Sequence, residues 1–390
     1  MQIPSPFDLL KGTVYEHYTV SAIKLTGGLV NHVWRVSDKD GCTVIVKYAG
    51  STMSAFPENA FSTERTEFEV RGLALLNGKR QLATGIAHVP ELCVLSELGQ
   101  AMENTPGVHI PQLLHYNSLV PFMVLEDIGN LKPYNAWYAP NHSQPPMVDL
   151  LLVSQGVGEW LARLHAFGFE NYDKLEEYFV NLPARQFMGT VFYDMLCRRL
   201  AEHKEFANDG DKLITRVRDF CQEINEPKSA GKTLLFGDLW SASVLFNPKS
   251  RTVNLLDLEF FDVGFIYNDV GHFVAHLLPL YYLCNPEYNP NTDPCPESVT
   301  AFLNAYKETL KGECPRAYTA LVSPGAVKQS TIFFGMEISR DVLTGYWCRC
   351  SKGGDAKDEM PLTCVCADEL LPFARKYIMN TSESIFNVLI

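Results

Sequence analysis

Residues 236–245 read Phe-Gly-Asp-Leu-Trp-Ser-Ala-Ser-Val-Leu, and residues 255–259 read Leu-Leu-Asp-Leu-Glu. Each segment adjoins a short apolar run typical of a strand, so together they predict a hairpin with Asp238 and Asp257 beyond its strand ends. Paired carboxylates there suit one base and one Mg²⁺ ligand, because a hydroxyl nucleophile needs a proton acceptor and a hard cation prefers oxygen. The structural alternative is that Asp238 caps a turn and Asp257 ends a strand.

A second set of features lies near the N-terminus. The stretch Leu25-Thr-Gly-Gly-Leu-Val-Asn31 falls between two predicted strands, where Gly27 and Gly28 can turn backbone N–H groups toward phosphates. Lys47 closes the next predicted strand, where a lysine can pair with nucleotide phosphates. A glycine hairpin or a strand lysine alone is common. Along the chain, the glycine turn and Lys47 are followed by a glutamate-rich helix at 64–76, a hinge at 126–128 and the two aspartates. This order of features favours a nucleotide site.

The chain predicts an α+β fold with a strand-rich first third and a helical remainder. Strands are expected at 20–25, 33–36, 43–47, 121–125, 233–236 and 253–257, and helices at 64–76, 148–167, 184–224, 297–311, 325–349 and 365–379. The segments 285–297 and 351–361 read as loops. We expect an N-terminal nucleotide-binding lobe at 1–128 that ends in a hinge, followed by a helical lobe with the catalytic hairpin and the acceptor site at 129–390.

Composition excludes several classes of protein. The chain has 390 residues, of which 46% are hydrophobic and 20% charged, so it is not a disordered type. Its formal net charge of −12 argues against nucleic-acid binding, which needs a basic field. The longest apolar run, 270–284, is interrupted by polar residues and shorter than the about 20 residues of a membrane span. The first residues lack a signal-peptide pattern, so we expect a cytoplasmic protein whose 11 cysteines stay reduced.

These motifs resemble the aminoglycoside phosphotransferase and choline kinase group, small-molecule kinases with a protein-kinase-like two-lobe fold. The resemblance runs from about residue 19 to 275 and rests on Gly237-Asp-Leu-Trp-Ser241, Leu256-Asp-Leu-Glu259 and Asn268-Asp-Val-Gly271. Within the group, the glycine turn and the Asp-Leu-Trp-Ser run look most like the fungal 4-hydroxytryptamine kinase and methylthioribose kinase types.

The resemblance implies a role for each matching residue. Asp238 would orient the acceptor hydroxyl or accept its proton, and Asp257 would hold Mg²⁺, helped by Glu259. Lys47 would contact the α- and β-phosphates and pair with Glu69, with Glu64 as the rival partner. The backbone of the hinge at Glu126-Asp-Ile128 would meet adenine. The implied nucleotide-binding set is therefore Gly27, Gly28, Asn31, Lys47, Glu69, Glu126 and Ile128.

Two positions depart from the family pattern. Phe236 stands where the family usually has a histidine, which helps to build the loop. Ser243 occupies the slot of an asparagine that serves as the second Mg²⁺ ligand, and a serine hydroxyl is shorter and a weaker donor to a hard cation. Ser243 thus joins the implied metal ligands, with weaker metal binding or lost activity as the alternative. Asp269 would brace the catalytic loop, and His165 would be structural.

Two further clusters carry weaker signals. Four cysteines could bind zinc, although residues two apart on a helix face different ways and free thiols are the simpler interpretation: Cys348, Cys350, Cys364 and Cys366. An aromatic and acidic wall could suit a cationic acceptor through cation–π contact, although helical-lobe aromatics more often form core. That wall comprises Tyr281, Tyr282, Tyr346, Trp347, Glu337 and Asp341.

We therefore predict an ATP- and Mg²⁺-dependent phosphotransferase that acts on a hydroxyl of a small metabolite, with a cationic or aromatic acceptor as one candidate. The fungal character of the motifs suggests secondary metabolism. A first alternative is a non-catalytic member that binds nucleotide or metabolite. A second is a kinase fold with other chemistry or a protein substrate, against which the chain lacks His-Arg-Asp and Ala-Pro-Glu segments. The sequence identifies neither the acceptor nor the oligomeric state, since selectivity lies in the divergent helical lobe.

Overall fold

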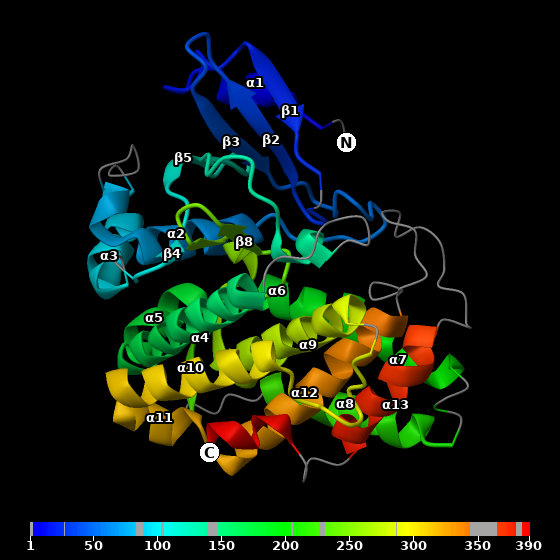
Figure 1. Ribbon diagram of the computed structural model, residues 1–390. Coiled ribbons are helices and arrows are strands. Elements are labelled where there is room, and N and C mark those ends of the chain that lie inside the picture. The colour runs from blue at the N-terminus through cyan, green and yellow to red at the C-terminus, as the bar shows by residue number, and fades with distance from the viewer. Residues whose placement is uncertain are drawn as a thin grey trace. The chain divides into compact units, whose positions relative to one another are not determined.

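The computed structural model describes residues 3–26, 28–82, 89–102, 105–138, 147–203, 206, 208–225, 231–285, 287–343, 365–379 and 384–390. These residues form two compact units (Figure 1). The first unit contains Met1–Leu131, Asn181–Ala184 and Asn254–Phe261, and the second contains the rest of the chain. The short segment 254–261, which carries Asp257 and Glu259, therefore folds with the N-terminal residues although it lies far along the chain.

A five-stranded antiparallel sheet organises the first unit, in the order β1-β2-β3-β6-β5 (Figure 1). The strands are β1 (Ser21–Lys24), β2 (His32–Ser37), β3 (Thr43–Tyr48), β5 (Leu113–Asn117) and β6 (Phe122–Glu126), and a short strand β4 spans Val108–His109. The four strands predicted in this region are confirmed to within a few residues, because β-branched alternation between turn residues is a strong local signal.

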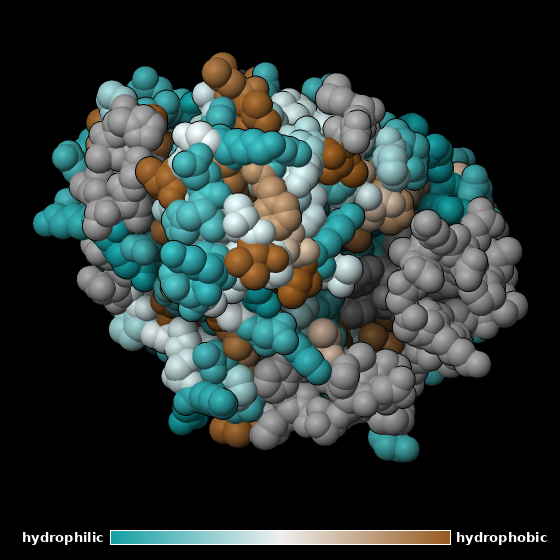
Figure 2. Space-filling model, turned by 90° about the horizontal axis from the view of Figure 1, so that it is seen from above, coloured by the Kyte–Doolittle hydropathy of each residue, from teal (hydrophilic) through white to brown (hydrophobic). Residues whose placement is uncertain are grey.

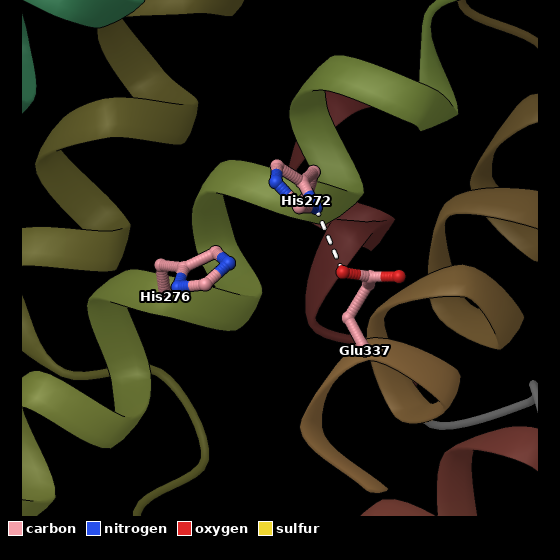
Figure 3. Close-up of side chains that lie close together, drawn as sticks. All are labelled: His272, His276 and Glu337. Atoms are coloured by element: carbon pink, nitrogen blue, oxygen red, sulfur yellow. Dashed lines mark ion pairs between the residues drawn. The ribbon is translucent and has the colours of Figure 1, made fainter. Parts of the chain in front are cut away.

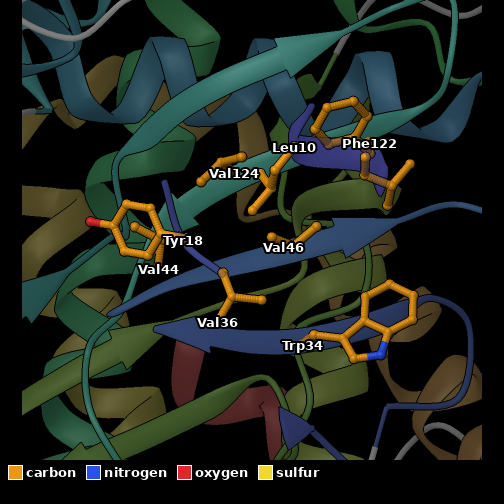
Figure 4. Close-up of a cluster of buried hydrophobic side chains, with 9 residues drawn as sticks. Leu10, Tyr18, Trp34, Val36, Val44, Val46, Phe122 and Val124 are labelled. Atoms are coloured by element: carbon orange, nitrogen blue, oxygen red, sulfur yellow. The ribbon is translucent and has the colours of Figure 1, made fainter. Parts of the chain in front are cut away.

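One face of this sheet packs against helix α1 (Pro6–Leu10). Figure 4 shows the resulting cluster of buried side chains: Leu9, Leu10, Tyr18, Trp34, Val36, Val44, Val46, Phe122 and Val124. Side chains alternate between the faces of a strand, so Val44 and Val46 point into this cluster and Lys47 points away from it. The strand pattern thereby places a lysine on the face opposite the apolar core.

Helix α2 (Arg65–Leu82) carries Glu69, one of the two carboxylate partners of that lysine. The helix predicted at 64–76 continues to Leu82 through a kink, because Gly78 has φ 52° and ψ −135° and helical turns resume after it. α2 packs on helix α3 (Pro90–Leu98), the turn η1 (Gly99–Ala101) and the turn η5 (Leu258–Phe260). A Cβ at Gly72 would lie 3.3 Å from the Phe261 ring, so a small residue there permits close approach to the segment 254–261.

The second unit is mainly helical. Its helices and turns are η2 (Tyr134–Tyr138), α4 (Met147–Glu170), α5 (Tyr172–Phe179), α6 (Leu182–Phe187, which begins in the first unit), the π-helical turn η3 (Met188–Tyr193), α7 (Asp194–Glu202), α8 (Gly210–Asn225), α9 (Tyr267–Cys284), α10 (Glu297–Glu313), α11 (Pro315–Leu321), α12 (Pro324–Leu343), α13 (Val365–Met379) and η6 (Ile385–Leu389). α4 packs along α10, and α12 packs on both α9 and α13. These contacts bury the apolar faces that the helical periodicity predicts.

Short strands flank the loop of the second unit that contains Asp238. β7 (Lys232–Leu235) pairs antiparallel with β10 (Asp262–Phe265), and β8 (Val244–Asn247) precedes β9 (Thr252–Leu255), which leads from the second unit into the first. Helix α4 continues past its predicted end at residue 167 to Glu170, and Gly168 within it has a packing role. A Cβ at that position would lie only 2.3 Å from the backbone nitrogen of Leu234 in β7.

The surface mixes polar and apolar side chains. Figure 2 shows brown hydrophobic residues scattered among hydrophilic ones, and the exposed large apolar residues include Val14, Val20, Ile23 and Leu119. Scattered apolar residues of this kind are normal for a water-facing surface. In the described part of the chain, no helix has the length and apolar character needed to cross a membrane.

Candidate active site

Lys47 is the centre of a buried ion-pair cluster in the first unit. Its Nζ lies 2.7 Å from Glu69 Oε1 and 2.7 Å from Asp257 Oδ1. The lysine comes from β3, the glutamate from α2 and the aspartate from the segment that precedes η5. Of the two glutamates proposed from the sequence as the lysine's partner, Glu69 makes the contact.

Burial and charge together set the protonation of this cluster. Although burial alone would lower the pKa of Lys47, the Asp257 and Glu69 carboxylates raise it, so the lysine stays a cation. Burial raises the pKa of Glu69 to about 7, against the opposing pull of Lys47. A protonated lysine beside an exposed carboxylate is equipped to bind phosphate oxygens and a cation together.

Asp257 has an unusual backbone conformation. Its φ of 65° and ψ of 64° lie in the left-handed region, which a non-glycine residue adopts at a steric cost. The strand predicted to reach this residue ends earlier, at Leu255. The side chain is 43% exposed, in contrast to Glu69 and Lys47. The chain thus holds one accessible carboxylate at the edge of an otherwise buried cluster.

Glu259 lies in a different environment from Asp257. Its Oε2 accepts a 2.6 Å hydrogen bond from Asn31 Nδ2 and lies 3.4 Å from Arg65 Nε. Arg65, fully buried on α2, also donates from Nη2 to Asn31 Oδ1 at 3.0 Å. Burial raises the pKa of Glu259, and Lys47 and Arg65 oppose that effect. Asn31 and Glu259 therefore tie the end of the glycine turn to the segment 254–261.

Of the other residues predicted to contact the nucleotide, the structure describes Gly28, Glu126 and Ile128. Gly27 lies outside the described residues, and open space surrounds the position of a Cβ at Gly28. The backbone N–H of Glu126 donates to the Gln112 carbonyl at 2.9 Å, so it is engaged within the sheet. Ile128 follows β6 in the half-buried segment expected to be the hinge.

An ion pair that sequence reasoning missed braces this hinge segment. Arg35 Nε and Nη2 donate to Asp127 Oδ2 and Oδ1 at 2.6 and 2.9 Å, and Nη2 also donates to the Gly129 carbonyl. Asp127 Oδ1 in turn accepts from the Gly129 N–H. The two-pronged contact fixes the chain after β6, since a guanidinium and a carboxylate match in a single plane.

In the second unit, Asp269 holds the loop that carries Asp238. Its carboxylate accepts hydrogen bonds from the backbone N–H groups of Phe236 and Gly237, both at 2.8 Å. His165 Nε2 lies 3.1 Å from Asp269 Oδ2, and its Nδ1 lies 2.7 Å from the Tyr306 hydroxyl. The predictions that Asp269 braces this loop and that His165 is structural are confirmed by these contacts.

The loop conformation depends on two of its residues. Gly237 has φ +87°, a value that favours glycine, immediately before Asp238. Phe236, which replaces the family's histidine, is buried and packs edge-on against Trp160. The apolar ring therefore fills the core beneath the loop.

Ser243 is a buried residue of this loop whose hydroxyl bonds to the loop backbone. Its side chain is fully buried, and its Oγ accepts from the Trp240 N–H at 3.1 Å and donates to the Trp240 carbonyl at 2.9 Å. The hydroxyl thus closes the turn that follows Asp238, a frequent use of serine. Its predicted role as a metal ligand stays a prediction.

Asp238 contacts a residue that sequence reasoning missed. Its Oδ1 lies 3.2 Å from Nε2 of His272 on α9, and Nδ1 of the same ring lies 2.9 Å from Oε2 of Glu337 on α12. The Asp238 side chain is 29% exposed, so one side of its carboxylate is open to solvent. The sequence signal was a polar residue in an apolar helix, which alone does not identify the partner.

The remaining sequence candidates have mixed outcomes. Tyr282 is fully buried and its hydroxyl bonds to Glu369, so it does not belong to an open aromatic wall. Tyr281 stacks edge-on with Tyr288 instead. Tyr346, Trp347, Cys348, Cys350 and Cys364 lie outside the described residues, as does the side chain of Cys366.

Among the described residues of the first unit, Asp257 is suited to bind a divalent cation. Asp257 offers an accessible carboxylate, and carboxylate oxygens are what Mg²⁺ prefers. The cluster contains the cations Lys47 and Arg65 against the carboxylates of Glu69, Asp257 and Glu259, so it has one negative charge in excess when all are ionised. The predicted closeness of Asp238 and Asp257 joins residues of the two units and stays a prediction.

Comparison with known proteins finds kinases that act on small molecules. No family model matches the chain. Over 264 residues it is 26% identical to a 4-hydroxytryptamine kinase of Psilocybe cyanescens, a match that covers 65% of this chain and 66%, just under two thirds, of the relative. A solved structure of an amicoumacin kinase with AMP-PNP and Ca²⁺ aligns with 95% of this chain and 92% of its own, at a TM-score of 0.50 and 12% identity.

The chain has the fold of a small-molecule kinase. The predicted α+β, protein-kinase-like fold is thereby confirmed, and so is the resemblance to the aminoglycoside phosphotransferase and choline kinase group. A choline kinase of Streptococcus pneumoniae also aligns, at a TM-score of 0.44 and 11% identity over 92% of this chain and 93% of its own. The resemblance to methylthioribose kinase stays a prediction.

Proposed function

We propose that this protein transfers the γ-phosphoryl group of ATP to a hydroxyl of a small molecule, with Mg²⁺ as the metal. The observation that carries the proposal is the buried Lys47–Glu69 pair beside the accessible Asp257 carboxylate. That constellation supplies a cation for phosphates and an oxygen ligand for a metal, which phosphoryl transfer needs. The relative named a 4-hydroxytryptamine kinase supports the same class of reaction.

In the proposed reaction Glu69 holds Lys47 in place, and Lys47 binds the α- and β-phosphates. Asp238 accepts the hydrogen bond of the acceptor hydroxyl. The hydroxyl oxygen then bonds to the γ-phosphorus, the bond from that phosphorus to the bridging oxygen of ADP breaks, and the hydroxyl proton passes to Asp238. Mg²⁺ bound at Asp257 would neutralise phosphate charge, and the protein contributes mainly positioning and electrostatic stabilisation.

The acceptor we propose is an amine-bearing hydroxyl compound of the 4-hydroxytryptamine type, since the matched relative has that name. The fungal character of the motifs is our reason for placing the reaction in secondary metabolism. A cytoplasmic location is part of the proposal because ATP is the phosphoryl donor. A non-catalytic nucleotide-binding protein is the second candidate, and Ser243 in the place of the family's asparagine favours it. The variant Ser243→Asn discriminates, because a large rise in Mg²⁺-dependent turnover would indicate a damaged metal site.

The experiment incubates the protein with γ-labelled ATP, Mg²⁺ and a panel of 4-hydroxytryptamine, choline and an aminoglycoside. We expect label on one acceptor, and a loss of about 10²–10⁴-fold in Asp238→Asn, the range for a residue that handles a proton. The folded state and AMP-PNP affinity of Asp238→Asn should be retained. Full turnover in that variant would contradict the role of Asp238, and ATP binding without transfer to any acceptor would favour the second candidate.

A further inference from the structure

In the second unit, Asp238 is the first of a series of charged side chains in contact, followed by His272, Glu337 and Arg340. The His272 ring faces Asp238 Oδ1 at 3.2 Å through Nε2 and Glu337 Oε2 at 2.9 Å through Nδ1. Figure 3 shows the ring of His272 on α9 turned toward the carboxylate of Glu337 on α12. The His272 and Glu337 side chains are 3% and 1% exposed. Both carboxylates therefore lie within ion-pair distance of the ring.

The position of the ring between two carboxylates constrains its protonation. A neutral imidazole has one N–H and one lone pair, so one of the two carboxylates would face a lone pair. An imidazolium carries a proton on both nitrogens and suits both neighbours. Burial alone would lower the pKa of His272, but Glu337 and Asp238 outweigh it and raise the pKa to about 10.

Glu337 is itself anchored on the side away from His272. Arg340 Nη1 donates to Glu337 Oε1 at 3.2 Å, and Arg340 Nη2 lies 2.8 Å from Oε2. The same guanidinium donates from Nε to Asp341 Oδ1 at 2.8 Å and lies 4.5 Å from the centre of the Phe192 ring. Arg340 thus fixes the carboxylate that holds the His272 ring.

We infer that His272 is a positioning residue for the proposed reaction: bridged to Glu337, it holds the Asp238 carboxylate in one orientation toward the acceptor hydroxyl. This inference rests on the proposed function. The physical reason is that an exposed carboxylate on a loop can rotate, whereas one paired with a fixed buried cation keeps the geometry that a transferring hydroxyl needs.

The same residues admit a competing interpretation as a metal site. Ligand atoms of His272, His276 and Glu337 all lie within 4.8 Å of one another, and the two histidines are one helical turn apart (Figure 3). However, Arg340 Nη2 lies 2.8 Å from Oε2 of Glu337, the oxygen that also faces His272, and a second cation there would be repelled. Burial, together with His272 and Arg340, lowers the pKa of His276 well below its usual value, so the neutral His276 adds no charge to the bridge.

The first test is independent of catalysis. Protein labelled with ¹⁵N in its 10 histidines is titrated by NMR, with His272 assigned by comparison with His272→Gln. We expect both ring nitrogens of His272 to remain protonated from neutral pH to beyond pH 8, and Glu337→Gln to bring its titration to lower pH. A neutral ring at pH 7, or titration near the ordinary value of about 6.5, would overturn the inference. Stoichiometric Zn²⁺ that is lost in His272→Gln would overturn it in favour of the metal site.

The second test separates positioning from structure. With whichever acceptor of the panel is phosphorylated, His272→Gln should lower kcat by about 10–100-fold, as for other residues that orient a reacting group. The KM for ATP should not change. His276→Gln is the matched control, since it makes the same substitution one turn along α9, and it should keep kcat. Equal losses in both variants would indicate a structural role and contradict the inference.

The two tests also distinguish the inference from the proposed function on which it rests. A wild-type protein that phosphorylates an acceptor, with an imidazolium bridge but unchanged kcat in His272→Gln, would overturn the positioning role alone. An imidazolium bridge in a protein that binds ATP but transfers phosphate to no acceptor would overturn the proposed function and, with it, the catalytic purpose of the bridge.

Discussion

Lys47 and Asp257 lie 210 positions apart in the sequence and form a 2.7 Å ion pair within one compact unit. The pair exists because the segment 254–261 packs on α2 and belongs to the first unit, although it lies far from the N-terminal residues along the chain. A strand lysine thereby meets the predicted metal ligand directly, and Glu69 holds the other side of the same ammonium. This arrangement is the structural basis of the proposed nucleotide site.

Lys47→Met removes the cation at the centre of that cluster. We expect AMP-PNP affinity or turnover to fall by about two orders of magnitude, because one preorganised charge on the phosphates is lost. Stability should also fall, since Glu69 and Glu259 are buried and lose their positive neighbour. Calorimetric titration with AMP-PNP and a thermal melt measure the two effects. Lys24→Met, the same change at an exposed lysine of β1, is the matched control and should leave both unchanged.

Asp257 and Glu259 should respond differently to loss of charge. Asp257→Asn should weaken the Mg²⁺ dependence of ATP binding, because its carboxylate is the accessible one. Glu259→Gln should instead cost about 1.5–3 kcal/mol of folding stability, because it disturbs charged hydrogen bonds to Asn31 and Arg65. Mg²⁺ titrations and chemical denaturation of both variants separate these effects. If Glu259→Gln raises the Mg²⁺ requirement as much as Asp257→Asn, Glu259 is a metal ligand and our assignment of it to the Asn31 contact is wrong.

The buried His272 predicts a pH dependence of stability. Its pKa is raised to about 10 in the folded state, above the ordinary value of 6.5. Between these values the folded protein keeps a proton that the unfolded chain has lost, so unfolding releases a proton and stability falls as pH rises. The stabilisation is complete below pH 6.5 and disappears as pH passes about 10. The difference in Tm between wild type and His272→Gln should therefore narrow from pH 6.5 to 10, and a difference that widens would contradict the ion-pair bridge.

The sequence predicted what local patterns encode. Alternating β-branched residues located the strands and placed Lys47 at the end of one of them. The family resemblance implied Glu69 as its partner, with Glu64 as the rival. The Gly-Asp turn and Asp269 were recognised because their motifs are short and contiguous. Each of these features depends on residues that are neighbours along one element.

Features built from distant segments were not predictable in the same way. The resemblance implied Glu259 as a helper of the metal ligand Asp257, but only the fold shows that Asn31 and Arg65 contact its carboxylate. His272 and Glu337 lie on separate helices, and their polar character within apolar runs gave no partner. The left-handed backbone of Asp257 likewise follows from tertiary contacts rather than from local preference, which disfavours it.

The most direct test of the central claim needs no knowledge of the acceptor: a thermal-shift titration of the protein with ATP, with and without Mg²⁺. A ligand at 100 times its dissociation constant adds about 2.7 kcal/mol to the stability of the folded state, enough to raise Tm measurably. We predict a Mg²⁺-dependent rise that is lost in Asp257→Ala and retained in Asp238→Asn, because the two aspartates serve metal and acceptor respectively. The absence of any shift at millimolar ATP would contradict the account.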